Sequence, residues 1–149
     1  MKGVIIKSVL LLLGLSLLCG AIYCAAKDNP PGEQKIRILF SDGEAIVELF
    51  DNPMAREFLA RLTMEAEFED FSRTEKIFYL PEKLDTRGGE DADQKKADFC
   101  YYAPWGNIAV FYKGYGHGSS LYALGRLLSG KDSIASQKNS FKARLEAIN

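Results

Sequence analysis

A chain of 149 residues has room for one domain with a sizeable hydrophobic core, and it is too short for two. Its 19 basic and 20 acidic residues give a formal net charge of −1, which indicates neither nucleic acid nor an anionic membrane surface as a partner. The single histidine excludes a two-histidine metal site within one chain. We expect a monomer without a metal or cofactor.

The first 26 residues have the pattern of a secretory signal peptide. Lys2 and Lys7 precede the apolar run Val9–Leu18, and the small residues Cys24-Ala25-Ala26 follow it. Cleavage after Ala26 would remove both lysines and lower the formal net charge to −3. The predicted location is therefore outside the cytoplasm, either periplasmic or extracellular.

Three alternatives for this segment stay open. Cleavage after Ala21 is the second choice of site. Cys19 or Cys24 could carry a lipid, although neither follows the small residue that lipidation prefers. An uncleaved segment could anchor the protein, because the apolar stretch approaches the ~18 residues that span a bilayer. Residues 27–34 contain Asn-Pro-Pro-Gly and predict an extended linker.

The domain is predicted over residues 35–130 and begins with a β-hairpin. Lys35–Ser41 and Glu44–Phe50 flank Asp42-Gly43, a strong signal for a two-residue turn. One face of this hairpin is then apolar, and the other carries an ion pair. The predicted opposite residues are Phe40 with Ala45, Ile38 with Val47, Ile36 with Leu49, and Arg37 with Glu48.

A short helix and two strands are expected next. Asn52 or Asp51 caps a helix that starts at Pro53, with four apolar residues spaced along one face. The apolar period then changes to two over Thr63–Asp70, whose outer face carries three glutamates. Lys76–Leu80 predicts a further strand, and Pro81 directly after it ends this strand.

A second hairpin is expected to organise the domain. Phe99–Ala103 and Ile108–Tyr112 flank the turn Pro104–Asn107 and are rich in aromatic and β-branched residues. Both runs are nearly continuous rather than alternating, which favours strands covered on both faces. Cys100 within the first run is predicted to be a buried structural residue. The polar segment Glu82–Ala97 before it predicts a long surface excursion, either a binding loop or a mobile one.

The C-terminal part has weaker patterns. Gly114–Ser120 is a glycine-rich loop, and Leu121–Leu128 predicts a short strand or a turn. Ser129–Asn139 is predicted to be a loop, and residues 131–149 are predicted to be a C-terminal tail. The tail is expected to contain a weakly amphipathic C-terminal helix with Ile134, Phe141, Leu145 and Ile148 on one face.

Short motifs between Ile36 and about Ser129 form a further pattern. They are Asp51-Asn52-Pro53 with Ala55 and Phe58-Leu59, Lys76-Ile77 with Tyr79-Leu80-Pro81, Asp98, Tyr101–Asn107, Phe111-Tyr112-Lys113 and Leu124-Gly125-Arg126. In this order they resemble the bacterial cyclophilin-like family. The resemblance implies a mainly β fold, a closed antiparallel β-barrel that is similar to the cyclophilin barrel but shorter. One or two helices would cover its openings, followed by the C-terminal helix.

The resemblance implies less about activity. True cyclophilins place an arginine from a Phe-His-Arg strand under the substrate proline, beside a glutamine from a Gly-Ser-Gln-Phe-Phe strand. The strands in the corresponding order here, Lys76–Tyr79 and Ile108–Tyr112, contain neither residue. A binding domain for a peptide or small-molecule ligand without strong catalysis is therefore expected. The alternative is a peptidyl-prolyl isomerase in which Arg87 or His117 supplies the missing donor.

Aromatic side chains are the predicted binding residues, because exposed Tyr and Trp on a rigid hairpin make good surfaces for peptides and rings. Trp105 is the only tryptophan, and its ring either folds over a barrel end or stands open as a ligand platform. The predicted ligand-binding residues are Tyr79, Tyr101, Tyr102, Trp105 and Tyr112.

Overall fold

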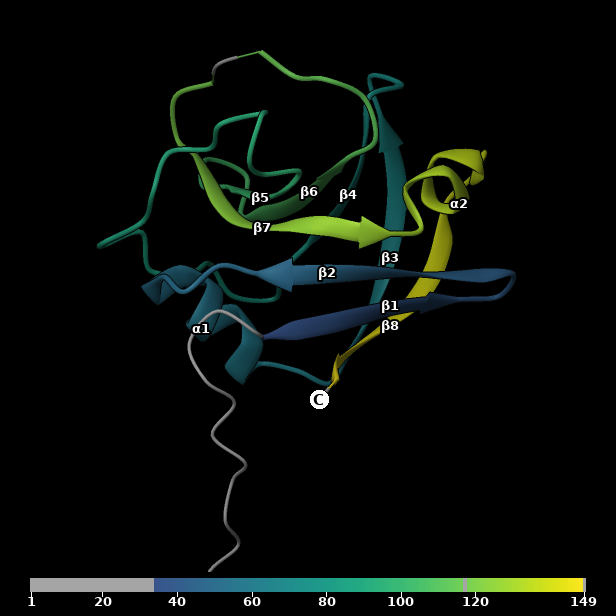
Figure 1. The fold of residues 1–149 in the computed structure, drawn as a ribbon, viewed down its shortest axis with the longest axis horizontal. Coiled ribbons are helices and arrows are strands. Elements are labelled where there is room, and N and C mark those ends of the chain that lie inside the picture. Colours follow the sequence, from purple (N-terminus) through teal and green to yellow (C-terminus); the bar gives the residue numbers. More distant parts are fainter. Residues whose placement is uncertain (1–33, 117, 149) are drawn as a thin grey trace, which may run out of the picture.

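The computed structural model of the protein describes residues 34–116 and 118–148, so the predicted signal peptide and its alternatives lie outside the described residues. Eight antiparallel strands close into a barrel in the order β1-β2-β7-β5-β6-β4-β3-β8 (Figure 1). The mainly β, closed-barrel prediction is confirmed. The elements are β1 Lys35–Phe40, β2 Gly43–Leu49, α1 Pro53–Ala60, β3 Met64–Phe71, β4 Glu75–Tyr79, β5 Phe99–Tyr102, β6 Asn107–Phe111, β7 Leu121–Ser129, α2 Lys131–Ser136 and β8 Phe141–Ile148.

The start of α1 is fixed by Asn52, as the sequence predicts. Its side-chain oxygen accepts a hydrogen bond from the backbone N–H of Ala55 at 2.9 Å, and Pro53 occupies the first helical turn. The Asn52 amide also donates to the backbone oxygen of Ala123 in β7 at 2.9 Å. A single buried side chain therefore caps the helix and ties it to the barrel wall. Figure 1 shows α1 and α2 on opposite sides of the barrel.

The first hairpin has its apolar face as predicted, but its register differs by two residues. Phe40 lies opposite Gly43 and Ile38 opposite Ala45, because the turn consists of Ser41 and Asp42 rather than Asp42 and Gly43. Side chains alternate with a period of two, so a shift of two leaves each of them on its predicted face. The predicted Arg37–Glu48 pair is replaced by ion pairs of the Arg37 guanidinium with Glu44 at 3.1 Å and Glu146 at 3.4 Å.

The predicted C-terminal helix is wrong, since the residues from Phe141 onward form the strand β8. Phe141, Ala143 and Leu145 alternate with charged residues, and this period of two matches a strand better than the helical spacing of the larger apolar residues alone. β8 pairs with β1 and with β3 and so closes the barrel, which extends the domain beyond residue 130. The helix in this region is instead α2, inside the predicted loop, with Ile134 buried.

The sheet formed by β4, β6, β5 and β7 is covered on both faces, as the continuous apolar runs predict. Its inner face belongs to the barrel core, to which β5 and β6 contribute Phe99, Tyr101, Ile108 and Val110. The outer face carries a second apolar cluster, which includes Cys100, Ala109, Phe111, Leu121 and Ala123. The segment between β4 and β5 covers part of this outer face, because the backbone of Ala92 hydrogen-bonds to Leu121 and that of Glu90 to Ala123.

Candidate functional site

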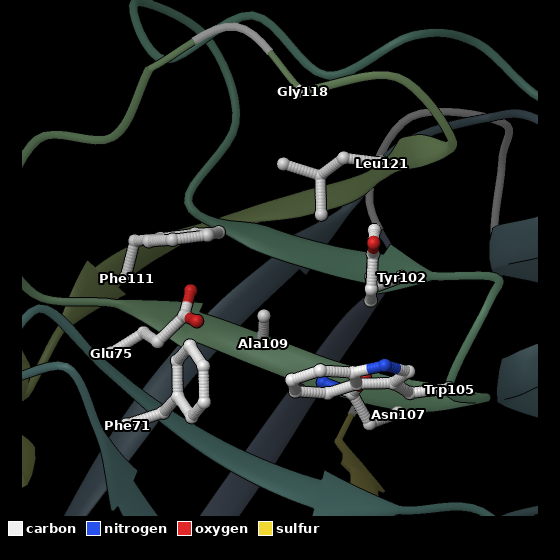
Figure 2. Close-up of a pocket in the computed structure, with 9 residues that line it drawn as sticks. All are labelled: Phe71, Glu75, Tyr102, Trp105, Asn107, Ala109, Phe111, Gly118 and Leu121. Atoms are coloured by element: carbon white, nitrogen blue, oxygen red, sulfur yellow. The ribbon is translucent and has the colours of Figure 1, made fainter.

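A pocket of about 320 Å³ lies on the outer face of the barrel, beside the second apolar cluster (Figure 2). This volume falls in the range of small-molecule sites. Residues from five strands and two connections line it, so it forms only when these strands pair. The lining residues are Phe71, Glu75, Tyr102, Trp105, Asn107, Ala109, Phe111, Gly118 and Leu121.

The floor of the pocket comes from the alternation of β6. Ile108 and Val110 point into the barrel core, so Asn107, Ala109 and Phe111 point outward. Ala109 stands in the middle of this row with only a methyl group, and the larger side chains on either side of it leave a hollow. The predicted strand is thus confirmed, and its smallest outward residue creates the depth of the pocket.

Trp105 forms one wall. Its ring is 49% exposed and makes edge-to-face contacts with Phe71 and Tyr102, at centroid distances of 5.4 and 5.5 Å. Gly106 follows with a φ of 72°, which lets the turn place the indole over the sheet. On the opposite side, Phe111 stacks on Tyr115 at 4.1 Å. The indole is therefore half-exposed on the outer face of the barrel and is not buried in the core.

Two polar side chains in the pocket have a buried oxygen without a hydrogen-bond partner among the described residues. They are Oε2 of Glu75 and Oδ1 of Asn107. Figure 2 shows the Glu75 carboxyl directed toward the middle of the pocket, between the rings of Phe71 and Phe111. Such unpaired buried acceptors are uncommon in folded proteins and often occur at functional sites.

The charge state of Glu75 is set by its surroundings. Burial, followed by the negative charge of Asp70, raises the pKa of Glu75 to about 7. Burial also opposes ionisation of Asp70, but hydrogen bonds from Lys76 at 2.8 Å and Tyr112 at 2.6 Å outweigh it and lower the pKa of Asp70. The Lys76 ammonium is almost fully buried and also contacts the backbone oxygen of Gln137. Asp70 therefore keeps its charge while Glu75 takes up a proton near neutral pH.

The predicted ligand-binding residues are only partly brought together. Trp105 and Tyr102 line the same pocket. Tyr79 is 55% exposed but lies outside this pocket. Tyr101 is fully buried in the core, where its hydroxyl accepts a hydrogen bond from the backbone N–H of Leu84 at 3.1 Å, so it offers no face to a ligand. Tyr112 packs against the barrel core and donates its hydroxyl hydrogen to Asp70.

Of the two weak catalytic candidates, only Arg87 belongs to the described residues. The Arg87 side chain is 90% exposed and forms an ion pair with Asp85, and it does not line the pocket. His117 lies outside the described residues. Cys100 is fully buried, and burial raises the pKa of its thiol to about 12, in keeping with a structural role.

Sequence reasoning missed most of the pocket. Phe71 and Glu75 lie just outside the two segments predicted as strands, and Asn107 and Phe111 belong to the predicted hairpin but not to the predicted ligand-binding residues. The local signal was the outward row Asn107, Ala109, Phe111, in which a small residue stands between two large ones. Nothing local marks Glu75 as its neighbour, because their proximity depends on the pairing of β4 with β6.

A small, closed antiparallel barrel with an aromatic pocket on its outer face is the class of protein that these features define. The chain belongs to the Cyclophilin-like family, whose family model matches residues 38–146. Its fold is similar to the solution structure of the hypothetical protein AF2241 from Archaeoglobus fulgidus, with a TM-score of 0.55 and 18% sequence identity over 79% of this chain and 98% of that chain. No curated protein matches the sequence.

No group of three or more His, Cys, Asp or Glu side chains in residues 34–116 and 118–148 is arranged to hold a metal ion. In the same part of the chain, no helix has both the length and the apolar character needed to cross a membrane.

Proposed function

We propose that this protein is a ligand-binding domain, and that its site is the outer-face pocket beside Trp105. The observation that carries the proposal is a preformed apolar pocket in which a carboxyl oxygen and an amide oxygen lack partners. Pockets with a mainly apolar lining and a few convergent polar groups are typical of small-molecule and peptide side-chain sites. A bound ligand would supply the missing hydrogen bonds and cover the half-exposed indole.

Trp105→Ala is expected to abolish binding while lowering the melting temperature by no more than a few degrees. The ring is half-exposed, so its removal leaves no closed cavity in the core, and surface changes typically cost well under about 1 kcal/mol. Ala109→Leu should also abolish binding, because the larger side chain projects into the pocket. Calorimetric titration with small aromatic compounds and proline-containing peptides, together with thermal melts, measures both effects.

Tyr79→Ala is the matched control, since Tyr79 is an exposed aromatic residue on β4 that does not line the pocket. Its ligand affinity should stay within about twofold of the wild-type value. Unchanged binding by both Trp105→Ala and Ala109→Leu would move the site elsewhere on the protein.

A protease-coupled assay with an Ala-Pro peptide is expected to show no acceleration of proline isomerisation at micromolar protein. The physical reason is that no arginine or lysine lines the pocket among the described residues, so a cationic donor for a twisting prolyl bond is missing. Acceleration that disappears in Trp105→Ala would instead identify the pocket as a rebuilt isomerase site. Acceleration that disappears in Arg87→Ala would place catalysis outside the pocket.

A further inference from the structure

The two unpaired oxygen atoms of the pocket both require a hydrogen-bond donor as partner. Glu75 Oε2 accepts hydrogen bonds when the carboxyl is ionised, and Asn107 Oδ1 accepts them in every state. The Asn107 amide nitrogen is already engaged by the backbone oxygen of Ile108 at 3.3 Å. A ligand that satisfies both oxygens must therefore be a donor of N–H or O–H groups.

The walls of the pocket favour a positively charged donor. Four aromatic side chains, Phe71, Tyr102, Trp105 and Phe111, surround the space into which Glu75 points (Figure 2). Aromatic faces attract cations, most strongly where water is excluded. The described lining residues include one carboxyl group and no lysine or arginine, so the pocket has no charge that would repel a cation.

We propose that the ligand of this pocket carries an organic ammonium group, which pairs with the Glu75 carboxylate and packs between the aromatic rings of Trp105, Phe71 and Phe111. This inference rests on the proposed function and specifies its ligand. The pocket volume of about 320 Å³ suits either a small amine with an apolar body or the end of a lysine side chain. The two sources share the same chemistry, and the experiment distinguishes them.

The test compares compounds of one shape and different charge on the intact protein. 2-Phenylethylamine is the cation, 2-phenylethanol the neutral analogue and 3-phenylpropanoate the anion, while Nα-acetyl-lysine N-methylamide presents the ammonium on a peptide unit. Titrations are run at pH 8, above the pKa of about 7 of Glu75, so that its carboxyl is ionised. The readout is the indole N–H resonance of Trp105, which is unambiguous because the chain has one tryptophan.

We expect the wild-type protein to bind an ammonium compound roughly tenfold or more tightly than 2-phenylethanol, and 3-phenylpropanoate least tightly. Glu75→Gln should weaken binding of the ammonium compound and so reduce this preference to within about twofold. Glu67→Gln removes an exposed carboxyl from β3 outside the pocket and should behave as wild type. Tighter binding of phenylethylamine than of the lysine compound indicates a free amine, and the reverse order a lysine side chain.

Two results would overturn the inference. Equal or tighter binding of the alcohol or the anion by the wild-type protein would remove the ammonium preference and leave the proposed function standing. An ammonium preference that persists in Glu75→Gln would show that Glu75 does not recognise the charge. A resonance that responds to none of these compounds, and to no peptide or aromatic compound in the earlier titrations, would count against the proposed function itself.

Discussion

Gly130→Ala is expected to destabilise the protein by about 2–4 kcal/mol, the largest effect of a single methyl group that we expect in this fold. Gly130 joins β7 to α2 with a φ of 81°, a left-handed conformation that costs other residues about 1–2 kcal/mol. A Cβ atom at this position would also lie 2.5 Å from Cα of Ala45 and overlap the carbonyl oxygen of Glu44. Both contacts are with the backbone of β2, which cannot move aside without disturbing its pairing with β1.

Chemical unfolding monitored by circular dichroism measures the loss, and thermal melts should show a decrease of roughly 10–20 °C. Gly116→Ala is the matched control, because Gly116 has nothing within 4 Å of an added Cβ and lies in an exposed loop. We expect its melting temperature to stay within a few degrees of the wild-type value. Equal stability of the two variants would contradict the close approach of Gly130 to β2.

Secondary structure could be predicted where one local pattern decided it. Asn52 before Pro53 marks the start of α1, and Asp42-Gly43 marks the first hairpin within one residue of its observed turn. The register error there arises because Ser41-Asp42 and Asp42-Gly43 are both acceptable two-residue turns. Only pairing of the hairpin with β7 and β8 selects between them.

The C-terminal strand shows the opposite case, in which one segment fits two periods. Phe141, Leu145 and Ile148 fit a helical face, whereas adding Ala143 makes the period two. Whether the segment forms a strand or a helix depends on its pairing with β1 and β3, which leave a gap in the barrel between them. β1 lies about a hundred residues earlier in the chain. Such long-range pairing leaves no local trace in the sequence.

In the candidate site too, residues marked by a local pattern could be predicted and residues placed by long-range pairing could not. Trp105 and Tyr102 could be predicted because both belong to one hairpin with a marked turn. Phe71 and Glu75 enter the pocket from β3 and β4, where pairing sets them opposite each other and sets Glu75 opposite Phe111. An isolated glutamate beside an expected strand has no distinguishing feature until the barrel encloses it in aromatic rings.

Burial of Glu75 has a consequence for stability, because the folded protein retains a proton that the unfolded chain releases. The carboxyl has a pKa of about 7 in the folded state, against an ordinary value of 4.5. Between these two values the folded state binds more protons at this group, so the free energy of unfolding falls as pH rises. This loss of stability is complete above about pH 7, and we expect it to amount to about 1–3 kcal/mol. Asp70 has a lowered pKa and acts only below this interval.

Glu75→Gln should therefore be more stable than the wild-type protein at pH 8 by about 1–3 kcal/mol, with a much smaller difference at pH 4.5. Glutamine keeps the shape of the side chain and stays neutral at every pH, so the slope that Glu75 contributes disappears. Urea unfolding at pH 4.5, 6 and 8 measures the difference, and Glu67→Gln at an exposed position of β3 should keep the wild-type slope. A constant difference between wild type and Glu75→Gln across this range would mean that Glu75 titrates near its ordinary value and that its carboxyl is hydrated in the folded protein.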